Sequence, residues 1–324
     1  MTEIVAVDIG GTHARFALAE VDGGRVLHLS EPVTLKTAEH PSLQLAWEHF
    51  AAEVGRPLPD KAGIAVASPV GGEVIKLTNN PWIIRPSLIG ERLGVSSYAL
   101  VNDFGAVGHA VAQMGSEHFR HLSGPEVSLP DNGVISVVGP GTGLGVAQVL
   151  RRDGHYFVSE TEGGHIDFAP LDRIEDAILD RLRKRYRRVS VERIVSGPGL
   201  VNIYEALAEI EGKAVHVPDD KTLWTTALAG TDSLASAALD RFCQCLGAAA
   251  GDFALAQGAQ GVVIAGGLGL RIADTIHRSG FAERFRAKGR FESMMAAIPV
   301  KQITHPEPGL YGAAAAWAIG AHPS

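Results

Sequence analysis

Residues 4–12 read Ile-Val-Ala-Val-Asp-Ile-Gly-Gly-Thr, an apolar strand that runs into a glycine turn ending in threonine. The same kind of stretch returns at residues 134–142, Val-Ile-Ser-Val-Val-Gly-Pro-Gly-Thr, 130 positions further along the chain. Each turn leads into a second strand, 14–18 or 144–149, and then through another glycine turn into a third strand. This repeated β-β-β unit predicts two related lobes, each of which offers one glycine-rich turn to a shared ligand.

The chemistry of the two turns favours phosphate. Glycine permits close approach of the backbone, successive N–H groups form a concavity that binds anions, and the threonine hydroxyl adds a donor. Asp8, at the end of the first strand, suits phosphate only with a cation between them. Two ordinary hairpins are the alternative, but the repetition together with that acid favours phosphate. A strand rather than a helix follows the first turn, and Gly-Lys-Ser/Thr is absent, so the dinucleotide-binding and P-loop fingerprints do not apply.

The composition is that of an ordinary soluble protein, with 324 residues, 46% apolar and 20% charged, enough for two domains. A net charge of −7 argues against a general nucleic-acid binder, and the one basic run, 181–188, is expected to be a solvated helix end. Only two cysteines, Cys243 and Cys245, and no visible signal peptide predict a cytoplasmic protein. The longest apolar run, 312–320, is too short to span a membrane, so no membrane partner is expected.

Strands alternate with helices along the rest of the chain, which predicts an α/β fold. An apolar strand at 98–101 runs straight into Asn102 and Asp103, and a helix is expected over 106–114. In such sheets ligands bind beyond the carboxyl ends of the strands. Asp8 and Asn102 are both expected at strand ends, so both are candidates for a binding site.

The second half of the chain repeats this plan and closes with an alanine-rich helix over 309–319, which suits close packing. A domain boundary is expected near residues 110–116, and the last helix is expected to return to the first domain. We therefore predict a small α/β domain formed by residues 1–112 plus 304–324 and a large α/β domain formed by residues 113–303.

Two motifs carry candidate chemistry. Asn102-Asp103 is the candidate catalytic pair, because a carboxylate held at the end of a buried strand can take the proton of a hydroxyl that attacks phosphorus; helix capping is the alternative. In Glu162-Gly-Gly-His165 the glycines bring a carboxylate and an imidazole to one side, which suits a polyol, although an incidental surface turn is the alternative. Glu192 adds a third carboxylate and carries almost no signal by itself.

These motifs occur in the order of one known family. The chain contains, in sequence, Asp8-Ile-Gly-Gly-Thr12, Asn102-Asp103-Phe-Gly105, Gly139-Pro-Gly-Thr-Gly-Leu-Gly145, Glu162-Gly-Gly-His165, Ser196-Gly-Pro-Gly199 and Ala265-Gly-Gly-Leu268. Each motif alone is weak to moderate, but the ordered set is specific. Through it the chain resembles, over essentially its whole length, the bacterial glucokinases of the hexokinase–actin–Hsp70 superfamily. The resemblance implies a two-lobed ribonuclease H-like and actin-like ATPase fold, with duplicated mixed-sheet domains around a cleft, and ATP-dependent phosphorylation of D-glucose.

The resemblance also implies roles for individual residues. The two repeated glycine turns would hold the phosphates of ATP, and a third glycine pair would lie by the adenosine. The implied nucleotide-binding residues are Asp8, Ile9, Gly10, Gly11, Thr12, Gly141, Thr142, Gly143, Gly266 and Gly267. The implied sugar-binding residues are Asn102, Asp103, Glu162, His165 and Glu192. Asp103 is implied as the general base, and Asp8 is implied to face the Mg²⁺ of Mg-ATP through water.

Several alternatives remain open. The ROK sugar kinases and repressors carry a cysteine-rich zinc loop after the Glu-x-x-His motif, whereas residues 166–190 contain no cysteine. His13 stands where the family more commonly has asparagine, so one side chain beside the phosphate turn differs. A kinase for fructose or mannose, or a non-catalytic sensor of sugar or nucleotide, is the alternative function. Polyphosphate or ADP as donor is compatible with the residue types, and a homodimer is the family expectation.

Overall fold

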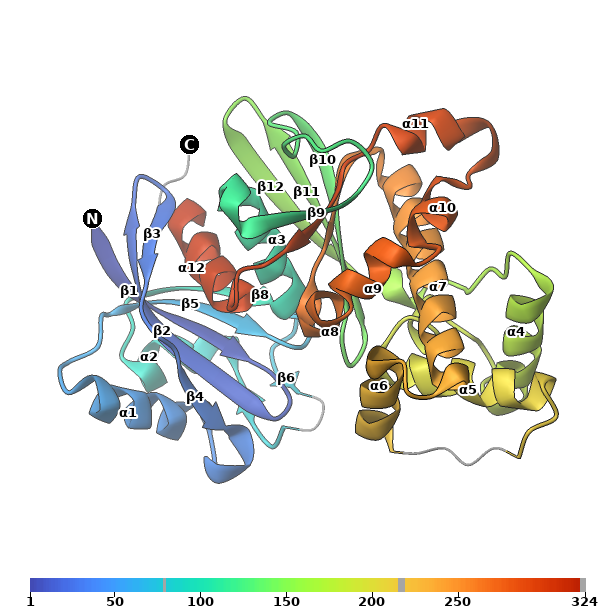
Figure 1. Cartoon of the computed structure of the whole chain (residues 1–324). Helices are drawn as coiled ribbons and strands as arrows, with labels where there is room; N and C mark the ends of the chain where they lie inside the picture. Colours follow the sequence, from blue (N-terminus) through green and yellow to red (C-terminus); the bar gives the residue numbers. More distant parts are fainter. Residues whose placement is uncertain (78–79, 215–218, 321–324) are drawn as a thin grey trace. The chain divides into compact units, whose positions relative to one another are not determined.

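The structure is a computed structural model of the chain, and it describes residues 1–77, 80–214 and 219–320 (Figure 1). Strands and helices alternate along much of this length, as the sequence predicts. Among the described residues, every helix is too short or too polar to cross a lipid bilayer.

The chain folds into two compact units. Unit 1 consists of Met1–Gly115, Val158–Glu160 and His305–Ser324, and unit 2 consists of Ser116–Phe157 and Thr161–Thr304. The sequence did not predict that the short stretch 158–160 would belong to unit 1. The predicted domain limits after residues 112 and 303 stay a proposal, and residues 321–324 of the predicted small domain lie outside the described residues.

The sheet of unit 1 has the strand order β3-β2-β1-β5-β8, with β4 paired to β2. Strands β1, β2 and β3 form the predicted antiparallel β-β-β unit, whereas β1, β5 and β8 run parallel. The strands are β1 Thr2–Ile9, β2 His13–Asp22, β3 Arg25–Leu29, β4 Val33–Lys36, β5 Lys61–Val66 and β8 Ser97–Asn102. A separate two-stranded hairpin pairs β6 Ile75–Lys76 with β7 Ile83–Ile84.

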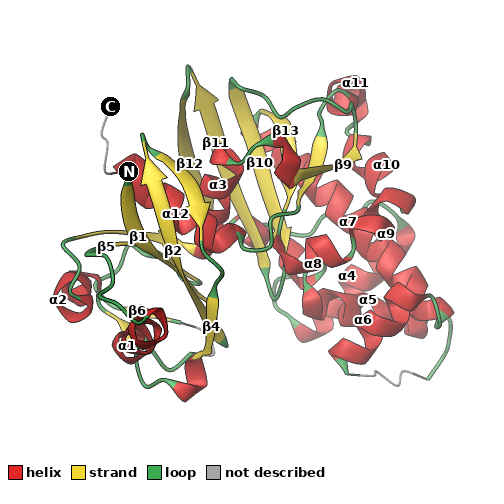
Figure 2. Ribbon diagram, turned by 60° about the vertical axis from the view of Figure 1, so that its left-hand side comes forward, coloured by secondary structure: helices red, strands yellow, loops and turns green. Residues whose placement is uncertain are grey.

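Helices cover both faces of this sheet, because side chains of β1 alternate between two buried cores. Val5 shares one core with Phe50 of α1, and Ile4 shares the other with Leu310 of α12. Figure 2 shows α1 and α12 on opposite sides of the sheet. The helices of unit 1 are α1 Leu43–Val54, α2 Ile89–Leu93, α3 Asp103–Gln113 and α12 Pro308–Gly320, with short 3-10 turns η1 Thr37–Glu39 and η2 Pro86–Leu88.

Helix α12 packs against α3 and β5 with their backbones almost in contact (Figure 1). A Cβ atom at Gly312 would lie 1.7 Å from the carbonyl oxygen of Ala106 on α3. A Cβ atom at Gly63 on β5 would lie 2.0 Å from the carbonyl oxygen of Ala313. Only glycine fits at these two positions, and the alanine-rich sequence of α12 permits the same close approach around them. Since Asp103 is the first residue of α3, this packing holds a candidate catalytic residue in place.

The sheet of unit 2 repeats that plan, with the order β12-β11-β10-β13-β14-β9. Strands β10 and β11 are antiparallel, β10, β13 and β14 run parallel, and β9 adds an antiparallel edge. The duplicated mixed sheets predicted from the sequence repeat are therefore confirmed. The strands are β9 Phe119–Ser123, β10 Gly133–Pro140, β11 Leu144–Arg152, β12 His155–Thr161, β13 Ala259–Ile264 and β14 Val300–Ile303.

The helices of unit 2 enclose one large core against this sheet, centred on α7. Helix α7 begins after Asp232, whose carboxylate accepts a hydrogen bond from the Ala235 N–H at 2.6 Å, and it ends at Gly258 with φ of 65°. The helices are α4 Arg173–Arg185, α5 Gly197–Ile210, α6 Asp220–Ala229, α7 Ser233–Gln257, α8 Gly266–Arg271, α9 Ala273–Arg278, α10 Phe281–Arg286 and α11 Glu292–Ala296. The 3-10 turns are η3 Ser116–His118, η4 Gly163–His165, η5 Val191–Arg193 and η6 Gly289–Phe291.

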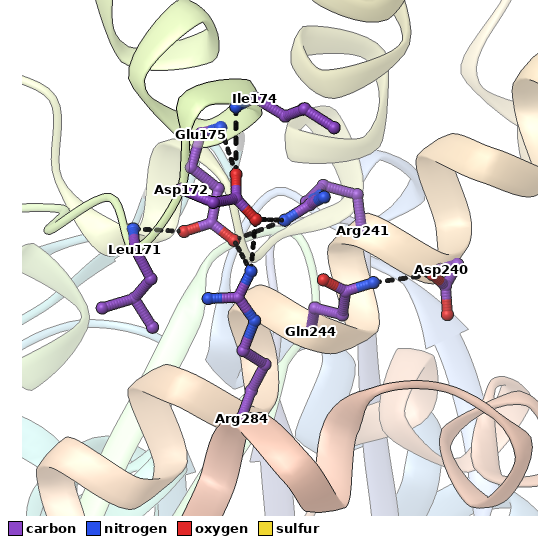
Figure 3. Close-up of polar contacts among 8 residues, drawn as sticks. All are labelled: Leu171, Asp172, Ile174, Glu175, Asp240, Arg241, Gln244 and Arg284. Atoms are coloured by element: carbon purple, nitrogen blue, oxygen red, sulfur yellow. Dashed lines mark hydrogen bonds and ion pairs between the residues drawn. The ribbon is translucent and has the colours of Figure 1, made fainter. Parts of the chain in front are cut away.

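A buried ion cluster joins α4, α7 and α10 (Figure 3). Arg241 of α7 donates to Asp172 at 2.6 Å and to Glu175 at 2.8 Å, while Arg284 of α10 pairs with the same two carboxylates. The Glu175 side chain is only 2% exposed, and its second oxygen accepts from the Leu171 N–H at 2.7 Å. This cluster therefore neutralises two acids and two bases inside one helical layer.

The basic run at 181–188 covers the end of α4 and most of it is exposed, as the sequence predicted, but two of its arginines also pair with acids of α5. Arg181 and Arg185 of α4 pair with Glu205 of α5 at 3.2 and 3.1 Å, and Arg181 also pairs with Glu209. The run thus forms part of the contact between α4 and α5. Nothing in the sequence beyond a net acidic α5 indicated this pairing.

Candidate functional site

The first glycine turn, residues 9–12, joins β1 to β2 and is held from its carbonyl side. Asn80 Nδ2 donates to the Gly10 carbonyl at 3.0 Å, and Thr37 Oγ1 donates to the Gly11 carbonyl at 3.1 Å. These supports come from two loops that are far apart in sequence from the turn. The turn is consequently rigid before any ligand arrives, which suits a preformed anion site.

Thr12 lies exposed at the tip of this turn, where a ligand can reach its hydroxyl. Its Oγ1 is 3.0 Å from Nδ1 of His13, the residue that departs from the family pattern. The His13 side chain therefore contacts the candidate phosphate-binding hydroxyl directly.

Asp8 ends β1 in a crowded, charged setting. Its carboxylate is 3.8 Å from Arg15 Nη1, and Arg15 in turn lies 3.4 Å from Glu307. A Cβ atom at Gly309 would lie 2.5 Å from Asp8 Oδ2, so the first turn of α12 approaches the carboxylate closely. Burial raises the pKa of Asp8 from 3.8 to about 6, with Asp103 and Glu307 adding to the rise and Arg15 opposing it. A further positive charge near Asp8 would favour its ionised form.

Asn102 and Asp103 meet the start of α3, which begins at Asp103 rather than at the predicted residue 106. Asn102 Oδ1 accepts from the N–H groups of Phe104 and Gly105 at 2.8 and 3.2 Å, so the capping alternative is correct for this side chain. Its Nδ2 donates to the Ser68 carbonyl at 3.4 Å. The side chain can still bind a ligand, because only its Oδ1 caps the helix, whereas its Nδ2 points away from the helix.

The Asp103 carboxyl group is partly buried at the helix start. Its Oδ1 accepts from the Phe104 N–H at 2.8 Å, which fixes the orientation of the group. Burial raises the pKa of Asp103 above its ordinary value, and the charge of Glu160 adds to this against the opposing hydrogen bonds. A carboxylate with a raised pKa is a stronger base than a solvated one.

The second glycine turn, residues 141–143, lies in unit 2 between β10 and β11. The Gly141 carbonyl accepts from the Gly197 N–H at 2.7 Å, at the first residue of α5. Glu192 Oε2 accepts from the Leu144 N–H at 2.9 Å, and a Cβ atom at Gly143 would lie 2.5 Å from the same oxygen. Glu192, which carried almost no signal in the sequence, therefore sits against the glycine turn.

The Glu162-Gly-Gly-His165 motif forms the short turn η4, as its glycines suggested. Glu162 and His165 lie 3.7 Å apart and are 71% and 55% exposed, so both face solvent on one side. The Val191 N–H donates to the Ile166 carbonyl at 2.9 Å. This bond brings the segment that carries the third carboxylate beside the motif.

Gly266 and Gly267 begin α8 directly after the buried strand β13. Gly266 has φ of 79°, and a Cβ atom there would lie 2.7 Å from the Pro140 carbonyl oxygen. Only glycine meets both conditions. The third glycine pair thus lies beside the second glycine turn, and unit 2 contains both of these together with the Glu162 motif, whereas Asp8 and the first glycine turn belong to unit 1.

Two residues of the site were missed by sequence reasoning. Gly309 makes room for the Asp8 carboxylate, and Glu160 contacts the start of α3. Neither belongs to a motif, and an exposed glutamate on a strand looks like any solvated residue. Within the described ranges, no group of three or more His, Cys, Asp or Glu side chains is placed to hold a metal ion.

Known proteins resemble this chain over nearly its whole length. A family model described as Glucokinase matches residues 5–319. The chain is 66% identical over 316 residues to the glucokinase of Zymomonas mobilis, with 98% of each chain covered. A solved glucokinase from an Antarctic psychrotroph has a TM-score of 0.87 at 34% identity, covering 98% of this chain and 99% of that one.

A more distant structure, the ROK family glucokinase from Streptomyces griseus in complex with glucose and AMPPNP, has a TM-score of 0.61 at 18% identity. The match covers 96% of this chain and 98% of that chain, and at this identity it shows the fold alone. Together these likenesses confirm the predicted fold class.

Proposed function

This chain belongs to the glucokinase family, so it phosphorylates D-glucose with ATP, and we propose that Asp103 is the general base of that reaction. The observation that carries this proposal is the setting of the Asp103 carboxyl group at the end of β8. The group is partly buried and is oriented by the Phe104 N–H, and burial is the main cause of its raised pKa. These are the properties of a positioned base rather than of a solvated carboxylate.

In this proposal the 6-hydroxyl of glucose attacks the γ-phosphorus of ATP, ADP leaves, and Asp103 takes the hydroxyl proton. Phosphoryl transfer depends mostly on positioning and on neutralising charge, so the protein has little covalent chemistry to perform. The Phe104 N–H holds Oδ1, and we assign Oδ2 to the proton. The raised pKa of Asp103 makes its carboxylate a stronger base than that of a solvated aspartate.

We assign the phosphates of ATP to the glycine turns at 9–12 and 141–143 and the adenosine to Gly266 and Gly267. Mg²⁺ would arrive with ATP as part of the substrate, and it would neutralise phosphate charge. The setting of Asp8 fits such a cation, because burial raises the pKa of this carboxyl to about 6 and a nearby positive charge would restore its ionised form. We propose that Asp8 faces this ion through water.

We assign the sugar hydroxyls to Asn102, Glu162, His165 and Glu192 together with Asp103. Carboxylates accept hydrogen bonds from hydroxyl groups, while an imidazole and an amide N–H₂ donate. Only the Oδ1 of Asn102 caps α3; its Nδ2 donates one N–H to the Ser68 carbonyl at 3.4 Å, and we assign the other N–H to the sugar. A missing or inverted hydroxyl would leave such groups unpaired, and that is how sites of this kind reject other sugars by roughly 10⁴-fold or more.

We expect Glu162→Gln and His165→Ala to raise the KM for glucose while changing kcat much less. Both side chains are exposed and contact each other at 3.7 Å, so neither change should disturb the core. His165→Ala loses one hydrogen bond, and Glu162→Gln replaces a charged acceptor by a neutral one; such changes are worth roughly 0.5–3 kcal/mol and hence up to about 100-fold in KM. Steady-state kinetics with varied glucose tests this. Unchanged KM values in both variants would show that η4 does not bind the sugar.

A panel of hexoses tests the function itself. We expect ADP release, measured by a coupled assay, to be fastest with D-glucose and much slower with fructose and mannose. Equal or faster turnover of another hexose would make the chain a kinase for that sugar. Absence of turnover with every sugar would favour the non-catalytic sensor. We also propose a cytoplasmic homodimer, for which sedimentation of the purified protein and cell fractionation are the tests.

A further inference from the structure

Glu160 lies on β12 in the short stretch Val158–Glu160 that belongs to unit 1. Its Oε2 accepts a hydrogen bond from the Asn102 backbone N–H at 3.2 Å. A Cβ atom at Gly105 would lie 2.5 Å from the same oxygen. The carboxylate therefore rests on the first turn of α3, in a space that exists because residue 105 is a glycine.

This contact adds to the side-chain hydrogen bonds that bind N–H groups at the start of α3. Asn102 Oδ1 takes the N–H groups of Phe104 and Gly105, and Asp103 Oδ1 shares that of Phe104. Glu160 takes that of Asn102 itself, the residue before the first residue of α3. A carboxylate is well suited to this place, because the N-terminus of a helix carries partial positive charge. The backbone N–H of Asn102, the residue before Asp103, is thus held by a side chain from another strand.

We propose that Glu160 is a positioning residue for the general base. By binding the Asn102 N–H and resting against Gly105, it fixes the backbone on both sides of Asp103, and so the direction in which the Asp103 carboxylate faces its substrate. It touches neither sugar nor nucleotide. The inference rests on the proposed role of Asp103.

The charge of Glu160 has a second consequence. The charged groups around Asp103 are the carboxylates of Glu160 and Asp8: Glu160 raises the pKa of Asp103, and Asp103 raises that of Asp8. Arg15 lies near both Asp8 and Glu307. Glu160 helps to raise the pKa of Asp103, after burial. Because it is exposed, solvent screens this effect and the contribution is modest. Removal of the charge therefore shifts the pKa of Asp103 downward.

Two variants separate the hydrogen bond from the charge. Glu160→Gln keeps an oxygen that accepts from the Asn102 N–H, whereas Glu160→Ala loses both oxygens. We expect Glu160→Ala to lower kcat about 10-fold, the size of one lost hydrogen bond to a charged group, with the glucose KM within about twofold of wild type. Glu160→Gln should retain most of kcat and move the acidic limb of the kcat/KM profile to lower pH. Glu91→Gln, at an exposed position on α2, is the matched control, with activity and profile unchanged.

The variants of Glu160 and Asp103 test the positioning role and the base assignment separately. If Asp103→Asn abolishes turnover but Glu160→Ala keeps kcat within twofold, the positioning role is wrong and the base assignment stands. If Asp103→Asn keeps turnover, the base assignment itself fails. Should Glu160→Ala not fold, Glu160→Asp decides, because its shorter side chain keeps the charge but withdraws the oxygen from the Asn102 N–H: a lowered kcat with an unchanged glucose KM supports the positioning role, and a kcat within twofold of wild type overturns it.

Discussion

Replacement of Asp103 by asparagine is expected to lower kcat by about 10²–10⁴-fold, the usual contribution of a positioned general base. Asparagine keeps Oδ1 and can still accept from the Phe104 N–H, so the start of α3 should be preserved. What the variant loses is the oxygen that takes the proton of the attacking hydroxyl. Glucose affinity, measured by titration calorimetry, should change little because the amide still binds a hydroxyl.

The pH dependence gives an independent check on this assignment. Burial raises the pKa of Asp103 in the folded protein, and the base works only when ionised. An ordinary aspartate titrates near pH 4, so the acidic limb of the wild-type kcat/KM profile should lie at a higher pH than this. The limb should be absent from any residual activity of the asparagine variant. Turnover close to that of wild type would show that another group takes the proton.

The second large effect concerns stability and the ion cluster of α4, α7 and α10. Arg241→Met leaves Glu175, only 2% exposed, with Arg284 as its remaining cation at 3.3 Å. Removal of one partner from a buried pair typically costs about 3–5 kcal/mol of unfolding free energy, and the remaining arginine favours the lower end. We expect a fall in Tm of roughly 6–12 °C, measured by differential scanning calorimetry.

Two further variants show whether the effect comes from an uncompensated charge. Arg183→Met, an exposed position on the same helix layer, should change the unfolding free energy by less than about 0.5 kcal/mol. Glu175→Gln combined with Arg241→Met should recover part of the loss. If Arg241→Met melts no lower than Arg183→Met, the cluster does not stabilise unit 2.

The cluster also has a defined pH dependence. Burial of Asp172 opposes ionisation, but the Glu175 N–H together with Arg241 and Arg284 outweighs it and holds the pKa of Asp172 below its usual value. A lowered folded pKa gives stability that is present above the unfolded value of about 4 and is lost as pH falls through the folded value. The difference in stability between wild type and Arg241→Met should therefore shrink in that acidic range.

Much of the fold could be predicted because its causes are local. Apolar residues occupy both faces of β1, such as Ile4 on one and Val5 on the other, and predict a strand that is buried on two sides. The glycine turns predict the hairpins. The start of α3 was misplaced because Asn102 caps the helix earlier than the apolar pattern indicates. The ordered motifs identified the candidate site residues through their resemblance to a family.

The parts of the site that could not be predicted from the sequence depend on contacts between segments that are distant in the chain. Glu160 is an exposed acid on a strand, and only the folded chain brings it to the Asn102 N–H, 58 positions away in sequence. Gly309 resembles any glycine near a helix start until Asp8 is found 2.5 Å from its missing Cβ. Local periodicity contains no information on such pairings.

The close fit of α12 against α3 and β5 has a consequence for how the protein is made on the ribosome. Translation proceeds at about 5–20 residues per second, so roughly 10–40 s separate the appearance of residue 115 from that of Pro308. During that interval one face of the first sheet, with Ile4 and Ala6, lacks the helix that finally covers it. The nascent N-terminal segment therefore waits with one apolar face uncovered until almost the whole chain has been made, because the helix that covers this face follows the last residue of unit 2.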